Sequence, residues 1–381
     1  MTEDSRKRAT SRRRFLARAA LGGAATAAAL PVRAQGPLWF RCQSAWPAKH
    51  IFYEYALDFA KKVNDMSGGD LRLDMLPVGA AAPASKLLDA VHSGALDGAH
   101  GALSQHFSRH PAFAKWGSCP VFGMDANMLL AWHKYGGGRQ LLAKIYATLG
   151  AEVTSFLTGP QPPQPLGWFK QRIARAEDLR GMRLRTDPVA KELFEKLGAQ
   201  VTLLPEADTP AAMASGALEG AELTNAVADS ALGVAAVSKI CMVGSYHQSA
   251  EQFEILLRRP RFEALPARVR AIVENAAEAA SQDVAWKSID RYSRAHEELR
   301  AKGGVAFHRT PEALLERQLA AYDALNATHT KDALVAEVER SQKAFAARAL
   351  RWQLDAAAGA ELAYDHYFAE RPGRAAARRK K

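Results

Sequence analysis

Arg185 is the residue whose position most clearly suggests chemistry. It ends the short apolar run Met182–Arg185 and lies just before Asp187 and Pro188. In sheets with parallel strands, ligands bind beyond the carboxyl ends of the strands. A guanidinium at such an end offers two parallel donors that match a carboxylate. The position is equally compatible with a surface arginine that pairs with Asp187, so the sequence leaves both interpretations open.

Motifs of catalysis and metal binding are absent from the sequence. It contains no G-x-S-x-G, no P-loop, no H-E-x-x-H and no C-x-x-C. Gly136–Gly138 lies inside a helical pattern, so it predicts a helix break and not a dinucleotide-binding turn. His106 and His110 would share a helix face, but a metal site needs further ligands. We therefore expect a protein that binds and does not catalyse.

The charge of the chain is concentrated at its two ends. Residues 1–34 and residues 371–381 each carry a net charge of +6, so of the total of +11 the remaining residues, 35–370, carry −1. A nucleic-acid-binding face needs clustered basic residues in the folded body. The sequence therefore excludes nucleic acid as a partner, and the basic tail 371–381 is expected to be disordered.

The first 34 residues have the organisation of an export signal. Ser11–Leu16 resembles the twin-arginine motif, an apolar run extends from Ala17 to Leu30, and Val32 and Ala34 suit a cleavage site after Ala34. A membrane anchor is the alternative, but the run of about 15 residues is shorter than the roughly 20 needed to span a bilayer. We expect a mature protein that begins at Gln35 and is located in a bacterial periplasm.

Strand and helix patterns alternate through the first two thirds of the mature chain. They open as β-α-β-α-β, which predicts an α/β fold with a largely parallel sheet. The segment Ser93–Ala99 (SGALDGA) recurs as Ser215–Ala221 (SGALEGA), which predicts two similar lobes. Helices are expected from Pro266 to about Lys302, over Pro311–Leu325 and over Lys331–Ala357.

Several motifs together resemble a known family, the solute-binding proteins of tripartite ATP-independent periplasmic (TRAP) transporters. The broad family signals are Leu179–Arg185, Leu197–Ala199 and Gly216–Glu222. The motifs typical of the 2-oxo-acid and lactate subgroup are Pro120–Met124, Trp132 with Tyr135–Gly138, Thr158–Gln161 and Gly167–Phe169. The resemblance covers most of Trp46–Pro266.

The resemblance implies two α/β lobes hinged around a cleft, with long C-terminal helices. The expected division assigns 35–155 and about 247–300 to lobe I and 156–246 to lobe II. Residues 301–370 then form helices that pack across the lobes or form a dimer. This subgroup forms homodimers, so a homodimer is expected here, together with the membrane subunits of the transporter as partners.

The resemblance also assigns the site. Arg185 would hold the ligand carboxylate, Glu222 is the family's acidic residue, and Tyr246 would pack on the ligand. The family glutamine near the hinge corresponds to Gln161, although the Pro162–Pro165 segment resembles an insertion and leaves Gln164 as the alternative. Glu222 and Gln161 would also be the ligands of any metal ion.

Two residues depart from the subgroup pattern: Leu223 replaces a tryptophan, and Gln248 replaces a second acid. In the subgroup the two acids help to hold a cation that bridges protein and substrate. A hard cation binds less well when one anionic oxygen donor is lost, so a bound Na⁺ or Ca²⁺ should be weakened. Leu223 in place of tryptophan should also reshape the pocket for a ligand that is bulkier or less polar than pyruvate.

These inferences predict a periplasmic solute-binding protein that captures a small organic acid, a 2-oxo acid, hydroxy acid or related monocarboxylate, and delivers it to TRAP membrane subunits. A binding protein that feeds a sensor would have the same sequence features. An enzyme that acts on a small carboxylate would need a base or nucleophile near Arg185, for which Glu222 and His247 are the candidates. Turnover of a 2-oxo or hydroxy acid would favour the enzyme.

Overall fold

The computed structural model describes residues 38–368, and its contacts group the chain from Trp39 onward into one compact unit. The predicted signal peptide, residues 1–34, and the predicted disordered tail, residues 371–381, lie outside the described residues. Among the residues described, no helix has both the length and the apolar character needed to cross a membrane.

The first sheet has five strands in the order β2-β1-β3-β10-β4. Its strands are β1 (Leu38–Ser44), β2 (Leu71–Leu76), β3 (Gly98–Ala102), β4 (Val153–Pro160) and β10 (Gln252–Arg258). β1 and β3 are parallel, whereas β10 is antiparallel to both β3 and β4. The parallel pairing that the opening β-α-β-α-β pattern predicted is confirmed for β1 and β3, whereas β10 lies outside that pattern and joins the sheet between β3 and β4 after the chain has built a second sheet.

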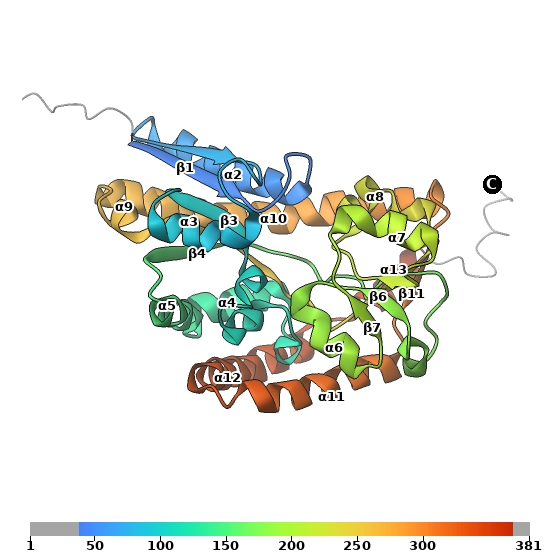
Figure 1. Cartoon of the computed structure of the whole chain (residues 1–381). Helices are drawn as coiled ribbons and strands as arrows, with labels where there is room; N and C mark the ends of the chain where they lie inside the picture. The colour runs from blue at the N-terminus through green and yellow to red at the C-terminus, as the bar shows by residue number, and fades with distance from the viewer. Residues whose placement is uncertain (1–37, 369–381) are drawn as a thin grey trace, which may run out of the picture. The chain divides into compact units, whose positions relative to one another are not determined.

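Helices cover the first sheet (Figure 1). They are α2 (Ile51–Ser67), α3 (Leu87–Ser93), α4 (Ala126–Tyr135) and α5 (Gly138–Thr148). The apolar side chains of α2 are buried at helical spacing, as the sequence predicted. The predicted helix break at Gly136–Gly138 is confirmed: Gly137 has φ +95°, and a Cβ on Gly138 would lie 2.6 Å from the Cα of His133. A side chain there would prevent α4 and α5 from approaching each other.

The second sheet has six short strands in the order β11-β9-β5-β8-β6-β7. They are β5 (Gly167–Phe169), β6 (Arg183–Arg185), β7 (Gln200–Thr202), β8 (Gly220–Ala221), β9 (Ile240–Val243) and β11 (Ala306–Arg309), with the helices α6 (Lys191–Lys196), α7 (Thr209–Ser215) and α8 (Ala226–Leu232). β6 is parallel to β7 and β8, and β5 is antiparallel to β8 and β9. β9 and β11 were not predicted from the sequence.

The two copies of the repeated segment have the same local structure. α3 ends at Gly94 and α7 ends at Gly216, both left-handed with φ +83° and +82°. Asp97 exchanges hydrogen bonds with the backbone of Arg41, and Glu219 does the same with Arg183. Each copy thus ties the turn before a strand to the neighbouring parallel strand.

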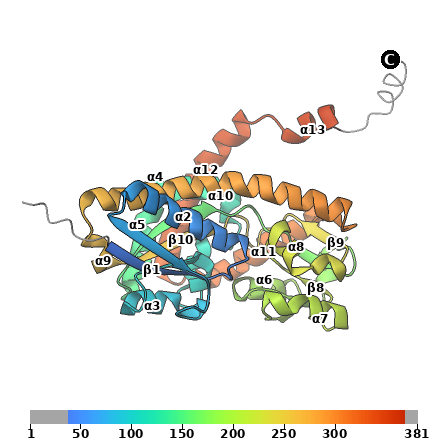
Figure 2. The same ribbon diagram turned by 90° about the horizontal axis from the view of Figure 1, so that it is seen from above.

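Besides the long connection from β10 to β11, two short segments join the sheets, residues 161–166 and residues 244–251. They run side by side: the amide of Gln161 donates to the carbonyl of Glu251 at 2.9 Å, and that of Gln164 to the carbonyl of Gln248 at 3.2 Å. After α9 (Arg259–Glu263), the long helix α10 (Ala267–Ala301) packs against β4 and α2 of the first sheet and against α8 beside the second (Figure 2).

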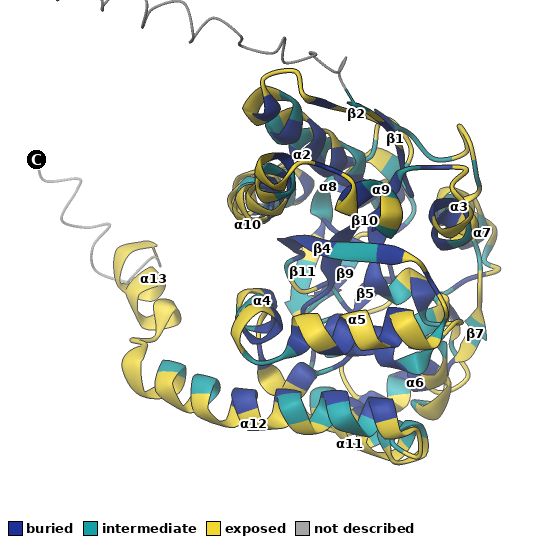
Figure 3. Cartoon of the chain, turned by 90° about the vertical axis from the view of Figure 1, so that its left-hand side faces the viewer, coloured by how far each residue is buried: buried dark blue, intermediate teal, exposed yellow. Residues whose placement is uncertain are grey.

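Three helices complete the chain: α11 (Glu312–His329), α12 (Ala333–Ala356) and α13 (Ala360–Phe368). α11 packs on α6, and the first half of α12 packs on α4 and α5. The last turns of α12 and all of α13 are exposed (Figure 3), although they carry apolar side chains, among them Trp352, Leu354, Leu362, Tyr364, Tyr367 and Phe368. The structure agrees with the predicted α/β class and with the predicted C-terminal helices.

Candidate functional site

Arg185 and Glu222 lie at the same edge of the second sheet. β6 and β8 are parallel neighbours in which Arg185 pairs with Ala221, so Glu222 follows β8 directly beside the end of β6. The amide of Glu222 donates to the carbonyl of Arg185 at 2.9 Å. Both side chains therefore extend from the carboxyl ends of parallel strands, where ligands bind in α/β folds.

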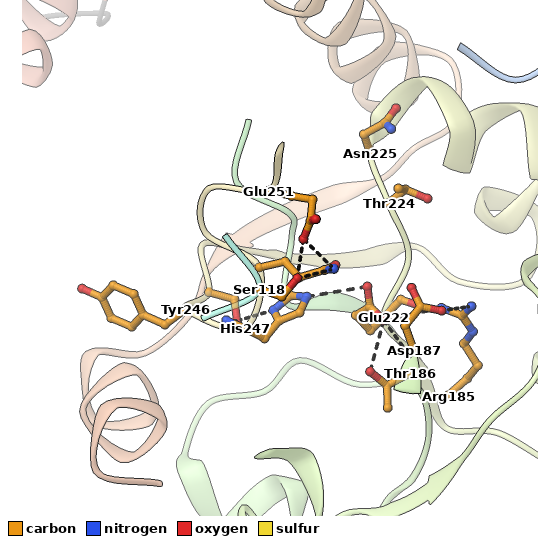
Figure 4. Close-up of polar contacts among 12 residues, drawn as sticks. Ser118, Arg185, Thr186, Asp187, Glu222, Thr224, Asn225, Tyr246, His247 and Glu251 are labelled. Carbon is orange, nitrogen blue, oxygen red and sulfur yellow. Dashed lines mark hydrogen bonds and ion pairs between the residues drawn. The ribbon is translucent and has the colours of Figure 1, made fainter. Parts of the chain in front are cut away.

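Arg185 is buried, with 2% of its surface exposed. Its Nε donates to the carbonyl of Leu204 at 2.9 Å, Nη1 to the carbonyl of Glu222 at 2.7 Å, and Nη2 to Oδ1 of Asp187 at 2.7 Å (Figure 4). Burial opposes the charge, but the neighbouring carboxylates outweigh it and raise the pKa of Arg185. The pairing with Asp187 that the sequence suggested does form, with the guanidinium of Arg185 buried and the Asp187 side chain partly exposed.

Glu222 is fully buried and holds several groups together. Its Oε2 accepts hydrogen bonds from Thr186 Oγ1 and from the Asp187 amide, both at 3.1 Å, and Oε1 lies 3.6 Å from His247 Nε2. Burial alone would raise the pKa of Glu222, but His247, Arg185 and the hydrogen bonds outweigh it and lower the pKa below its usual value. The structure thus stabilises the ionised carboxylate.

Asp187 has the opposite environment. Desolvation of its carboxylate by the surrounding protein and the negative charge of Glu222 raise the pKa of Asp187 to about 7, although the positive charge of Arg185 acts to lower it. Its side chain nevertheless keeps 38% of its surface exposed, against 3% for Arg185 and 1% for Glu222. Asp187 is therefore the member of this group that solutes can reach.

The three glutamines expected in the site lie on the connecting segments, and all are buried. The surrounding hydrogen-bond partners fix the orientation of the Gln164 side-chain amide. Its nitrogen lies 2.7 Å from Glu222 Oε1, 2.5 Å from Gln248 Oε1 and 3.2 Å from the carbonyl oxygen of Leu223. The Gln164 oxygen accepts from Gln161 Nε2 at 3.1 Å. Gln164 thus contacts Glu222 directly, and Gln161 lies behind it.

A second buried acid, which the sequence analysis did not identify, adjoins Gln248. Glu251 accepts hydrogen bonds from the hydroxyl of Ser118 and from the amide of Ser104, and Gln248 Nε2 lies 3.4 Å from its Oε2. Burial raises the pKa of Glu251 to about 7. In the sequence, Glu251 is marked only by its position three residues after Gln248, and this spacing is too weak a signal to identify it as a site residue.

Tyr246 is placed differently from the role expected for it. Figure 4 shows its side chain pointing away from Glu222 and Arg185, and its amide donates to Gln318 Oε1 of α11 at 2.9 Å. The next residue, His247, points toward Glu222 and is fully buried. Its Nδ1 lies 2.7 Å from Ser245 Oγ, while its Nε2 has no hydrogen-bond partner.

Leu223 also differs from expectation. Its side chain is completely buried and belongs to the apolar core of the second sheet, with Trp168, Met213 and Leu218 among its members. Only its carbonyl faces the site, 3.2 Å from the Gln164 amide. In this structure the Leu223 side chain packs in the apolar core of the second sheet, and its effect on the choice of ligand stays a prediction.

Residues 38–368 contain no cluster of three or more histidine, cysteine, aspartate or glutamate side chains that could hold a metal ion. A cation here would depend on amide and backbone oxygens around the single carboxylate of Glu222. Oxygens of Glu222, Gln248 and Leu223 do converge on the end of the Gln164 amide. If that amide is turned over, its own oxygen joins them, and oxygen ligands of this kind suit Na⁺ and Ca²⁺.

The chain is similar to known proteins in sequence and in fold. A model of the family described as bacterial extracellular solute-binding protein, family 7, matches residues 42–330. A monocarboxylate 2-oxoacid-binding periplasmic protein of Nostoc sp. is 26% identical over 313 residues, which is 82% of this chain and 85% of that protein.

Two solved structures have the same fold. A TRAP transporter solute-binding protein from Bordetella bronchiseptica RB50, a mixed-occupancy dimer with calcium and picolinate, gives a TM-score of 0.78 at 22% identity and covers 91% of this chain and 100% of that one. A TRAP periplasmic solute-binding protein from Colwellia psychrerythraea with calcium and pyruvate gives 0.79 at 24% identity and covers 87% and 100%.

Proposed function

Because the chain belongs to family 7 of the bacterial extracellular solute-binding proteins, the TRAP solute-binding family, we propose that it captures a small monocarboxylate in the periplasm and delivers it to TRAP membrane subunits. The ligand would be a 2-oxo acid, a hydroxy acid or a related monocarboxylate. The single observation that carries this proposal is the buried guanidinium of Arg185 at the carboxyl end of β6, beside Glu222.

In this function Arg185 would receive the ligand carboxylate through its terminal nitrogens. Its other donors are held by the carbonyls of Leu204 and Glu222, which fix the plane of the guanidinium. A fixed plane favours a bidentate contact, because less side-chain freedom is lost on binding. Gln164 and His247 would then meet the remaining polar groups of the ligand, because both contact Glu222.

We further propose that each sheet is the core of one lobe, with 161–166 and 244–251 as the hinge segments between them. Support comes from the paired hydrogen bonds of Gln161 with Glu251 and of Gln164 with Gln248. Gln161, Gln164, His247 and Gln248 all lie on these segments. A ligand held by them and by Arg185 would bind better to one hinge angle than to others, which is how a bound ligand signals a loaded state.

A Na⁺ or Ca²⁺ ion is part of the proposal. Glu222, Gln248, the carbonyl of Leu223 and a turned Gln164 amide would hold it, and it would bridge the protein to the ligand's oxygens. Gln248 supplies a neutral oxygen where the subgroup has an acid, so the ion would be held more weakly than in a site with two carboxylates. Export by the twin-arginine route and a homodimer are also proposed.

A thermal-shift screen of the mature chain from Gln35 tests the proposal. Pyruvate, lactate and benzoate would each be added with Ca²⁺, with Na⁺ and with a chelator. A ligand at 100 times its dissociation constant stabilises a protein by about 2.7 kcal/mol, which is a visible shift of the Tm. A shift by a carboxylate that shrinks in chelator is the expected result. Equal Tm shifts with and without chelator would contradict the proposed cation. No shift with any carboxylate would contradict the proposed ligand class.

A further inference from the structure

The donors of Arg185 are already largely engaged within this chain. A guanidinium carries five N–H groups. In this structure Nε and Nη1 donate to the carbonyls of Leu204 and Glu222, and Nη2 donates to Asp187 Oδ1 at 2.7 Å. A ligand carboxylate bound in the bidentate way needs two parallel N–H groups on one edge of the fork. Asp187 already accepts a hydrogen bond from Nη2, the nitrogen that both bidentate edges of the guanidinium include, so a bidentate ligand must either displace Asp187 or share Nη2 with it.

Asp187 differs from the other partners of Arg185 in being free to leave. The Leu204 and Glu222 contacts are made by backbone carbonyls, whereas the Asp187 contact is made by a side chain with 38% of its surface exposed. The amide of Asp187 donates to Glu222 Oε2 at 3.1 Å, which fixes the backbone. A change of the χ1 rotamer alone would therefore move the carboxylate from Arg185 toward the exposed side.

The charges around the Arg185 guanidinium favour replacement of Asp187 by the ligand carboxylate over binding of the ligand beside Asp187. Arg185 attracts Asp187, while Glu222 and Glu206 both repel it. A ligand anion that joined this group with Asp187 still in place would be a further negative charge next to one arginine. An anion that replaces Asp187 leaves the number of carboxylates at Arg185 unchanged. Exchange thus lets a carboxylate bind in a place that already contains an excess of acids.

We propose that Asp187 is an internal competitor for the ligand: its carboxylate occupies the fork of Arg185 when no ligand is bound and is displaced by the ligand's carboxylate. This inference rests on the proposed function, since it requires a carboxylate ligand at Arg185. Asp187 then sets the affinity of the site, because each binding event must break one charged hydrogen bond of the protein. A weaker hold on the ligand also speeds its release to the membrane subunits.

The test compares dissociation constants for pyruvate, lactate and benzoate, measured by titration calorimetry on the mature chain. The variants are Asp187→Ala, which removes the competitor, and Asp187→Asn, which removes its charge. Glu195→Gln is the control, because it removes an exposed acid from α6 beside the same sheet. A charged hydrogen bond is worth enough to change affinity about ten-fold or more. We expect binding about ten-fold tighter in Asp187→Ala, a smaller gain in Asp187→Asn and none in the control.

A second readout separates competition from a merely structural role. Without ligand, Asp187→Ala should have a lower Tm than the wild type, since the buried guanidinium of Arg185 loses a charged hydrogen-bond partner. Its ligand-induced rise in Tm should be larger than in the wild type. A fall in both quantities would mean that Asp187 only supports the fold.

The remaining outcomes overturn the inference in distinguishable ways. Weaker binding in Asp187→Ala would mean that Asp187 contacts the ligand itself, as it would if the ligand carried an ammonium group. Equal binding in the wild type and Asp187→Ala would leave the proposed function standing and refute the competition alone. If neither folded protein binds any of the three acids, the competition and the proposed function fall together.

Discussion

At the scale of single residues, Glu222 connects the parts of the site. Its carboxylate accepts hydrogen bonds from the Thr186 hydroxyl and the Asp187 amide, which follow β6. It also faces Gln164 and His247 on the two connecting segments. A buried charge persists only when such partners surround it. The position of Glu222 is thus set by the fold, and the residues that contact it are those through which a ligand would act on the proposed hinge segments.

Leu223→Trp tests the division between site and core at this position. Leu223 is fully buried among the apolar side chains of the second sheet. A tryptophan there must overpack the core, and overpacking typically costs about 1–3 kcal/mol. We expect a clear fall in the Tm, measured without ligand, and little direct change in which acids bind. A variant with an unchanged Tm and altered ligand preference would show that this side chain faces the ligand after all.

At the scale of elements, the repeated segment is the clearest link between sequence and structure. Gly94 and Gly216 end α3 and α7 in the left-handed conformation, and each is followed by the same turn into a strand. The repeated turn before β8 places Glu222 beside Arg185 in the second sheet. Gly216 is required for its backbone conformation and not for lack of space. Its φ is +82°, and a Cβ there would meet only the Lys170 side chain, at 3.8 Å.

Gly216→Ala measures that conformational cost. Alanine in the left-handed region costs roughly 1–2 kcal/mol, and the open surroundings add little. The expected result is a loss of unfolding free energy of this size in urea denaturation. Gly359→Ala is the control, because its Cβ would also meet open space while its φ is not positive. Equal stability of the two variants would contradict the assignment of the turn.

The sequence predicted elements better than their pairing. Most helices and the strands β1, β2, β4 to β8 and β10 were anticipated because their apolar spacing is local, whereas α8, α9 and α13 were not. β3 is the last strand of the predicted β-α-β-α-β opening; its sequence, Gly-Ala-His-Gly-Ala, consists mainly of small residues and gives only a weak strand signal, although all five residues are buried. β11 pairs with β9 only after the 35-residue helix α10. Arg185, Glu222 and the glutamines were found through their motifs, and His247 was named only as a candidate base, whereas Glu251 depends on contacts that no local pattern contains.

At the scale of the whole molecule, the exposed apolar helices at the C-terminal end need an explanation. Beyond Leu350, α12 and α13 expose Trp352, Leu354, Leu362, Tyr364, Tyr367 and Phe368. Exposed apolar surface of this kind commonly marks an interface between proteins. A second copy of the chain is the partner we propose, and a dimer is the form in which the Bordetella bronchiseptica protein was described.

Deletion of the residues after Arg351 tests this interface. Light scattering on the mature protein should give the mass of a dimer for the full chain and that of a monomer for the shortened one. Circular dichroism should show that the shortened chain keeps its fold, since the buried contacts of α12 end before that point. A shortened chain that remains dimeric would place the interface elsewhere, and a monomeric full chain would refute the dimer.

The most direct measurement of the central claim is the affinity of Arg185→Lys for the carboxylate that binds the wild type. Lysine keeps the charge but loses the planar fork, so binding should weaken by about 1–3 kcal/mol, roughly ten- to a hundred-fold. Arg183→Lys is the matched control, because Arg183 lies on the same strand, is exposed and pairs with Glu219. Unchanged affinity in the control and a large loss in Arg185→Lys would support the account. Wild-type affinity in Arg185→Lys would contradict it and remove Arg185 from the site.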